Sequence, residues 1–131
     1  MEEQLRYALN VGYNASIFGK KTVLRLNFKI AHKIDELEVL ETKVVKQIQE
    51  VKVNLASIEQ ILFGKILYRG DISDLIDGEL PEYNDVKDFI NVYNHAIKNK
   101  NIDTEWLKQK VSQKGLEITL NRILNLAKRF A

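Results

Sequence analysis

An apolar residue recurs at every seventh position over residues 30–62, and this repeat constrains the fold more than any other feature of the chain. The first position of each heptad is filled by Ile30, Leu37, Val44, Val51 and Ile58. The second position carries Ile34, Ile48, Leu55 and Leu62, with Glu41 as its one polar interruption. Heptads sustained over this length are typical of a helix that packs along one face against another helix. The sequence therefore predicts one long heptad helix.

Residues that break helices are missing from the same part of the chain. Neither Gly nor Pro occurs between Gly19 and Gly64, so the predicted helix extends over about residues 23–63, with Thr22 as its N-cap. The heptads alone would make a rod of about 50 Å, whereas a compact globule of this length is about 35–40 Å across. The scarcity of Pro also argues against a fold with many turns and strands.

These patterns predict an all-α fold, an elongated antiparallel helix bundle of the four-helix type. Residues 1–131 are expected to form a single helical domain, in which residues 1–21 make a short helix or a flexible arm. A turn or two of helix is predicted at residues 71–78 and a longer helix at residues 85–98. Asp103 or Thr104 should cap the next helix. Gly115 then marks either a boundary between two helices or a kink in one.

The sequence carries no sign of catalytic or metal chemistry. Cys is absent and only two His are present, which excludes thiolate catalysis and Cys-based zinc sites. The acidic residues 71–88 do not place oxygen ligands at the spacing of an EF-hand. We therefore predict a protein that is not an enzyme, with no cofactor, no metal and no small-molecule substrate. No transmembrane segment or signal peptide is predicted, and Asn14 lies in a glycosylation sequon whose use the sequence leaves open.

Charge is distributed unevenly along the chain. Residues 1–29 and 101–131 each have a net charge of +3, whereas residues 70–100 have a net charge of −4. Such a chain could pair with copies of itself or present a basic surface to nucleic acid or another partner. A solvated basic face is the simpler explanation. The candidate contact residues are Lys20, Lys21, Arg25, Lys29, Lys108, Lys110, Lys114, Arg122, Lys128 and Arg129.

The order of these segments resembles that of a viral protein family. Residues 23–30 lead into the heptads, and an acidic middle broken by Gly and a basic last helix follow. This layout is similar to that of the small helical coat proteins of archaeal two-tailed spindle-shaped viruses, the bicaudavirus type. The resemblance implies a four-helix bundle that builds the virion, with the protein in the host cytoplasm before assembly. It also implies a related homologue that inhibits the host RNA polymerase.

The first functional prediction is therefore a virion structural (coat) protein that acts by helix-mediated self-association. The alternative is a regulatory binding protein that inhibits host RNA polymerase or contacts nucleic acid, such as viral DNA, through its basic ends. A DNA-packaging role is a third, weaker interpretation. The predicted core of the long helix consists of Ile30, Ile34, Leu37, Val44, Ile48, Val51, Leu55, Ile58 and Leu62.

Overall fold

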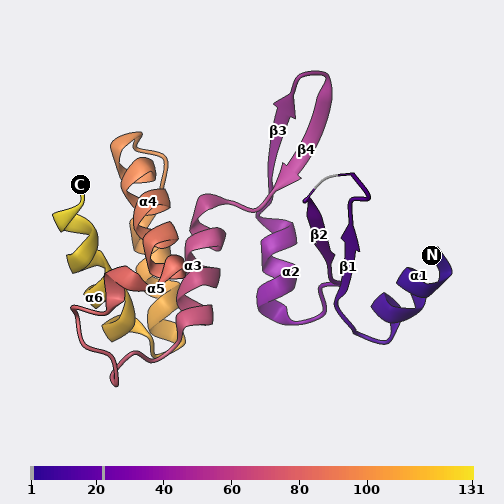
Figure 1. Ribbon diagram of the computed structural model, residues 1–131. Coiled ribbons are helices and arrows are strands. Elements are labelled where there is room, and N and C mark those ends of the chain that lie inside the picture. The colour runs from indigo at the N-terminus through magenta and orange to yellow at the C-terminus, as the bar shows by residue number, and fades with distance from the viewer. Residues whose placement is uncertain (1, 22) are drawn as a thin grey trace. The chain divides into compact units, whose positions relative to one another are not determined.

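The computed structural model describes residues 2–21 and 23–131 of the chain. Contacts between residues group the chain into two compact units, Met1–Glu41 and Thr42–Ala131. Figure 1 shows the course of the chain through both units. The sequence predicts one domain, whereas these contacts place a boundary directly after the one residue that interrupts the heptads, Glu41.

The first unit combines two helices with a two-stranded sheet. It contains α1 (Glu2–Asn10), β1 (Ala15–Phe18), β2 (Arg25–Phe28) and α2 (Ile34–Glu41). The strands are antiparallel, with Ala15 opposite Phe28 and Phe18 opposite Arg25. None of the described residues of this unit is buried. The unit therefore has no apolar core of its own in the part that the structure describes.

A glutamate at the start of α2 stabilises the first turn of that helix. The Glu36 carboxylate forms an ion pair with Lys29 and accepts the backbone N–H groups of His32 and Lys33, each at 3.1 Å. A carboxylate at the third helical residue that accepts the backbone N–H before the helix is one half of a capping box. The Lys29 ammonium, followed by the two backbone N–H groups, lowers the pKa of Glu36 to about 2.

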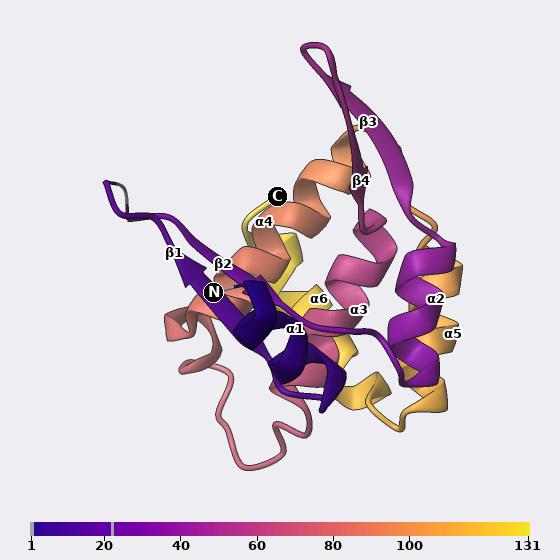
Figure 2. The same ribbon diagram turned by 90° about the vertical axis from the view of Figure 1, so that its right-hand side faces the viewer.

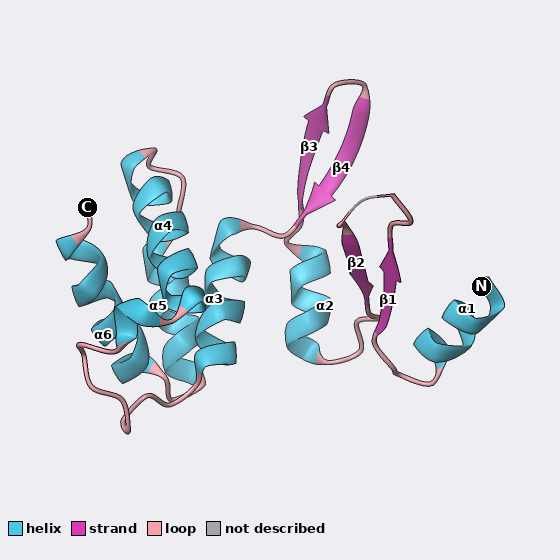
Figure 3. Ribbon diagram, viewed as in Figure 1, coloured by secondary structure: helices cyan, strands magenta, loops and turns pink. Residues whose placement is uncertain are grey.

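The second unit begins with a hairpin and continues as helices (Figure 3). The hairpin consists of β3 (Val44–Ile48) and β4 (Val51–Leu55). The elements that follow are α3 (Ile58–Arg69), the 3-10 helix η1 (Leu80–Glu82), α4 (Asn84–Lys98), α5 (Thr104–Gln113) and α6 (Glu117–Arg129). Helix α3 contacts α4 and α5, and α6 contacts α4 and α5, so the four helices surround a common interior (Figure 2).

The buried apolar side chains of the described chain, apart from Ala96, gather in one cluster inside these helices. Apolar residues recur at three- and four-residue spacing in each helix, which turns one face of the helix inward. Ile72 and Leu80 add two side chains from the segment between α3 and α4. The cluster consists of Leu62, Phe63, Ile66, Ile72, Leu80, Val86, Phe89, Ile90, Leu107, Val111, Leu120, Ile123, Leu126 and Ala127.

Two arginines fix the segment that joins α3 to α4. Arg69 forms a two-pronged ion pair with Asp85, at 2.7 Å from Nε to Oδ2 and 2.6 Å from Nη2 to Oδ1. Arg122 of α6 donates to the backbone oxygens of Ile72, at 2.7 Å, and Leu75, at 2.6 Å. Because a guanidinium carries five donors in a rigid plane, it can hold several acceptors of an irregular segment at once.

The helix ends follow the capping rules. Ser57 caps α3 by accepting the backbone N–H of Gln60, and Asp103 caps α5 by accepting that of Trp106. Helix α5 ends in a Schellman motif, in which Leu116 N–H donates to Val111 O and Gly115 has a φ of +68°. Gly115 therefore separates two helices, and the alternative of one kinked helix is wrong. The helix predicted at residues 85–98 is confirmed, and so is Asp103 as a cap.

The prediction of an all-α four-helix bundle with one long heptad helix is wrong. Helices make up 54% of the structure and strands 14%, in two separate two-stranded sheets. Residues 23–63 form β2, α2, β3, β4 and the start of α3 instead of one helix. The proposed cap, Thr22, lies outside the described residues.

The predicted core of the long helix is also wrong, apart from its end. Leu62 is fully buried and Ile58 is half-buried, whereas Ile30, Ile34, Leu37, Val44, Ile48, Val51 and Leu55 are exposed. The physical reason is the type of residue that fills the repeat. Val and Ile are stiff at χ1 and favour strands, and residues 44–55 contain five of them. The predicted helical turn at residues 71–78 is a series of turns without helix.

Candidate functional site: the apolar face of the hairpin

The register of the β3–β4 hairpin separates apolar from polar side chains. Val44 pairs with Leu55, Lys46 with Val53 and Ile48 with Val51. Because paired residues lie on the same side of a sheet and alternate residues share a side, these six side chains occupy one face. The opposite face carries the pairs Val45 with Asn54 and Gln47 with Lys52. We call the first face the hairpin apolar face and define it as Val44, Ile48, Val51, Val53 and Leu55.

The hairpin apolar face is largely open to solvent. Val44 is 39% exposed, Ile48 57%, Val51 62% and Leu55 42%. Among the described residues, β3 and β4 pair only with each other. A two-stranded hairpin on its own is marginally stable in water, and stable sheets have more strands or a packed face. The hairpin thus has the composition of a buried strand pair without the cover that such a pair needs.

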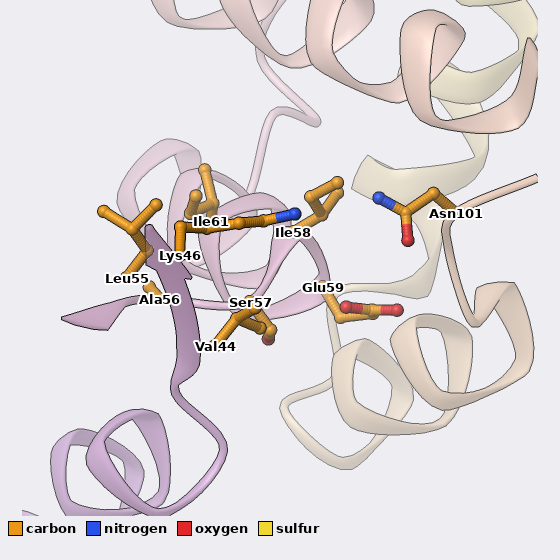
Figure 4. Close-up of a pocket in the computed structure, with 9 residues that line it drawn as sticks. All are labelled: Val44, Lys46, Leu55, Ala56, Ser57, Ile58, Glu59, Ile61 and Asn101. Atoms are coloured by element: carbon orange, nitrogen blue, oxygen red, sulfur yellow. The ribbon is translucent and has the colours of Figure 1, made fainter. Parts of the chain in front are cut away.

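A hollow of about 310 Å³ lies where the hairpin joins α3 (Figure 4). Val44 and Leu55 of the hairpin line one side, and Ile58 and Ile61 of α3 line the other. Figure 4 shows the Lys46 side chain extended across the hollow toward Ile58. The hollow is at the small end of the range for ligand pockets, and its walls are mostly aliphatic, so it suits an apolar side chain better than a polar metabolite.

Polar groups at the edge of the hollow are already engaged. Ser57 accepts the Gln60 N–H as the N-cap of α3. Glu59 accepts the backbone N–H of Asp103 at 2.8 Å, which fixes the start of α3 against the start of α5. In both contacts the partner is a backbone N–H group, so these side chains serve to fix helix ends. The part of the chain that the structure describes has no group of three His, Asp or Glu side chains placed to hold a metal ion.

Exposed apolar residues are concentrated in the same half of the chain. Of the 24 large apolar residues that are exposed in the described part of the chain, 17 lie from Tyr7 to Leu55. Every apolar residue that is buried in the described ranges, 2–21 and 23–131, lies at or after Leu62. The described residues of the first unit, which we call the N-terminal segment, and the hairpin therefore each expose many large apolar side chains, whereas the helices that follow have the interior of a folded domain.

The four N-terminal candidate residues lie in the first unit. Lys20 and Lys21 are exposed in the connection between β1 and β2. Arg25 donates to Asn27 at 2.9 Å and lies over the Phe18 ring, 5.4 Å from its centre. Lys29 forms the ion pair with Glu36 described above. Two of these four cations thus take part in local structure.

The six C-terminal candidates lie in α5, in α6 and between them. Arg122 is committed to backbone oxygens and to Asp77, and Lys110 lies over the Trp106 ring, 5.7 Å from its centre. Lys114 ends α5, and Arg129 is in the last turn of α6. The remaining two, Lys108 and Lys128, line one hollow of about 610 Å³ between α4 and α6.

Amide side chains share this second hollow with the two lysines. Asn121 and Asn125 of α6 line it together with Lys108 and Lys128, and Tyr93 of α4 forms part of the opposite wall. Lys108 is 3.3 Å from Glu105 in an exposed pair, which is a weak interaction. Lysine, amide and aromatic groups together suit contact with an anionic polymer. The sequence analysis found the two lysines and missed the asparagines, which gave no signal before the helices were placed.

The apolar face of the hairpin was missed for a different reason. Four of its five residues, all except Val53, were assigned to the buried seam of a helix, whereas the structure places them on strands with exposed side chains. The strand signal was the run of β-branched residues in Val44–Ile48 and Val51–Leu55. Polar Gln49 and Glu50 between the two runs form the turn, and Gln49 has a φ of +56°.

Comparison of the chain with protein-family models, with curated proteins and with solved structures finds no match. No helix in the described part of the chain has the length and apolar character needed to cross a membrane.

Proposed function

We propose that this protein is a self-associating structural protein whose copies assemble through the hairpin apolar face and the N-terminal segment. One observation carries the proposal, namely that in the described part of the chain 18 of the 24 exposed large apolar residues precede Leu62, the first residue of the core. Burying apolar surface contributes about 25 cal/mol per Å², so an assembly that covers these side chains gains a large driving force.

The proposal keeps the predicted class of function and changes its mechanism. The sequence analysis assigned association to a long heptad helix, and association now rests on strands that are exposed in the single chain. A virion coat is one assembly of this class. The virion role and location stay predictions, because the run of residues that prompted the resemblance forms β2, α2, β3, β4 and the start of α3 instead of one long helix.

Sedimentation velocity over a wide range of protein concentration tests the proposal. The wild-type chain should form oligomers as its concentration rises. The double variant Val51→Lys with Val53→Lys adds two charges to the hairpin apolar face and should remain monomeric at concentrations where the wild type associates. The matched control Val45→Lys with Gln47→Lys adds the same two charges to the opposite face and should still associate.

Two results would overturn the proposal. The first is a wild-type chain that stays monomeric across the whole range at both low and high salt. The second is equal loss of association in the two double variants, since net charge alone would then explain the effect. Circular dichroism of each variant shows whether the helices of the second unit remain folded.

A second candidate function is contact with nucleic acid through the hollow between α4 and α6. Lys108, Lys128, Asn121 and Asn125 favour it because they meet there without a buried acidic side chain among the lining residues. Such contact would be weak, insensitive to sequence and strongly reduced by salt. This matches the prediction made from the basic ends of the chain, with the contact narrowed to one surface.

Retention of a duplex DNA fragment at increasing salt tests this candidate. Lys128→Glu should weaken retention. It should also reduce the slope of log affinity against log salt concentration by about one, the contribution of one phosphate contact. The control Lys87→Glu makes the same charge change at an exposed position of α4 that lines a different hollow. Equal effects of the two variants would indicate a general effect of net charge, and would count against a site at this hollow.

A further inference from the structure

The edge of β4 is free to pair with another strand. Among the described residues, β4 pairs only with β3, and it contains no Pro, Gly or bulge that would blunt its outer edge. Ile48 and Val51 are the pair on either side of the two-residue turn. In such a hairpin this pair exchanges hydrogen bonds, and the bonded pairs then alternate along the ladder. The backbone groups of Lys52 and Asn54 therefore point away from β3.

These outward groups make β4 complementary to itself. If two copies of β4 lie antiparallel around Val53, the outward groups of Lys52 in one copy meet those of Asn54 in the other. Val53 then faces the same residue of the second copy in a non-hydrogen-bonded pair, where side chains approach most closely. Val51 lies opposite Leu55 in this register. Each opposed pair is apolar with apolar or charged with neutral, so no like charges meet.

The outer edge of β3 lacks this property. Its outward backbone groups belong to Val45 and Gln47, so two copies of β3 would pair around Lys46. Lys46 would then face the same lysine of the second copy at the closest spacing in the ladder, which is unfavourable. The distribution of lysines along the two strands thus selects β4 as the edge that pairs.

We infer that two copies of this chain pair through their β4 edges around Val53 and form one four-stranded antiparallel sheet. This inference rests on the proposed self-association and assigns its first contact. The two-fold axis of such a pair is perpendicular to the sheet, so both hairpin apolar faces lie on the same side. Four strands with a common apolar face meet the requirement for a stable sheet that the single hairpin fails.

Proline substitutions at the two edges give a matched test by sedimentation velocity. Asn54→Pro removes an outward N–H from β4, whereas Gln47→Pro removes an outward N–H from β3. Neither N–H is used inside the hairpin. Asn54→Pro should weaken association at least tenfold, and Gln47→Pro should leave it within about twofold of the wild type. The reverse order would place the contact at β3 and overturn the inference.

A charge exchange tests the register without proline. Asn54→Lys places lysine opposite Lys52 of the second copy at both symmetric positions and should weaken association about tenfold. Adding Lys52→Glu to that variant places glutamate opposite lysine at both positions and should restore association. If Lys52→Glu does not restore association, this register is wrong. The charge exchange also decides the case if both proline variants are monomeric.

The two proposals fail in different ways. A wild-type chain that is monomeric at all concentrations refutes self-association itself. A wild type that associates, together with an Asn54→Pro variant that associates equally well, leaves self-association standing and refutes pairing through β4. Association of Asn54→Lys at wild-type strength leads to the same conclusion about β4.

Discussion

The ion pair between Arg69 and Asp85 should be among the stronger polar contributions to the stability of the second unit. Its two hydrogen bonds are 2.7 and 2.6 Å long, and the side chains are only 17% and 19% exposed. Hydrogen bonds to charged groups contribute about 1.5–3 kcal/mol, and exposed ion pairs about 0–1 kcal/mol. We expect a coupling free energy of about 2 kcal/mol between Arg69 and Asp85.

A double-mutant cycle isolates this coupling from the other contacts of the two residues. Arg69 also lies over the Tyr83 ring, 4.4 Å from its centre, and Asp85 lies in the first turn of α4, where an acidic group is favourable. Both contributions cancel in the cycle of Arg69→Met and Asp85→Asn. Unfolding in urea can be followed by the fluorescence of Trp106, the one tryptophan of the chain.

A neighbouring ion pair provides the internal control. Lys65 and Asp88 also join α3 to α4, but their charged atoms are 3.8 Å apart and the side chains are 29% and 64% exposed. The same cycle for this pair should give about 0–1 kcal/mol. Equal coupling in the two pairs would refute the reasoning, because burial and two-pronged geometry would then add nothing.

Three further variants test other parts of the structure. Leu62→Ala should lower the free energy of unfolding by about 2–5 kcal/mol, whereas Leu55→Ala in the monomer should lower it by less than about 1 kcal/mol. Urea unfolding at low protein concentration measures both values. A larger loss for Leu55→Ala than for Leu62→Ala would contradict the exposed position of Leu55. Because the pKa of Glu36 is lowered to about 2 from an ordinary value of 4.5, its stabilisation of α2 is present above pH 4.5 and is lost as the pH falls through 2. The NMR resonances of the backbone amides before α2 should therefore shift as the pH falls through 2. In Glu36→Gln this shift should be absent. Lys100→Gly should raise the melting temperature, because Lys100 has a φ of +51° that glycine adopts without strain, and no change would mean that this strain is negligible.

The C-terminal helices were predictable because several local signals agree there. Helix α4 combines a 3.6-residue apolar period with a start just after Pro81, and α5 begins directly after the capping residue Asp103. The Schellman motif at Gly115 separates α5 from α6, and the sequence had placed either a helix boundary or a kink at that glycine. Where propensity, period and caps point to the same structure, a short segment specifies its own fold.

Residues 30–55 were not predictable in the same way because two periods overlap in them. Spacings of three and four residues, as in Val44, Ile48, Val51 and Leu55, fit a helix. A two-residue turn between Ile48 and Val51 brings the same residues onto one face of a hairpin. Strand propensity decides between the two, and it is a weak signal when no partner strand is identified.

The candidate site was predictable in part for a related reason. The sequence identified a set of regularly spaced apolar residues and a set of basic residues near both ends, and most side chains of both sets are exposed in the structure. It did not show that Arg122 is committed to backbone oxygens of Ile72 and Leu75, since those contacts join segments about 50 residues apart. Nor could it show that Lys108 and Lys128 share a hollow.

Amide hydrogen exchange of the hairpin, followed by NMR at low and high protein concentration, tests the central claim most directly. The account predicts that the backbone amides of Lys52 and Asn54 exchange quickly in dilute solution and become protected as the concentration rises. The amides of Val45 and Gln47, on the outer edge of β3, should exchange quickly at both concentrations. Fast exchange of Lys52 and Asn54 in a sample that sedimentation shows to be associated would contradict the claim.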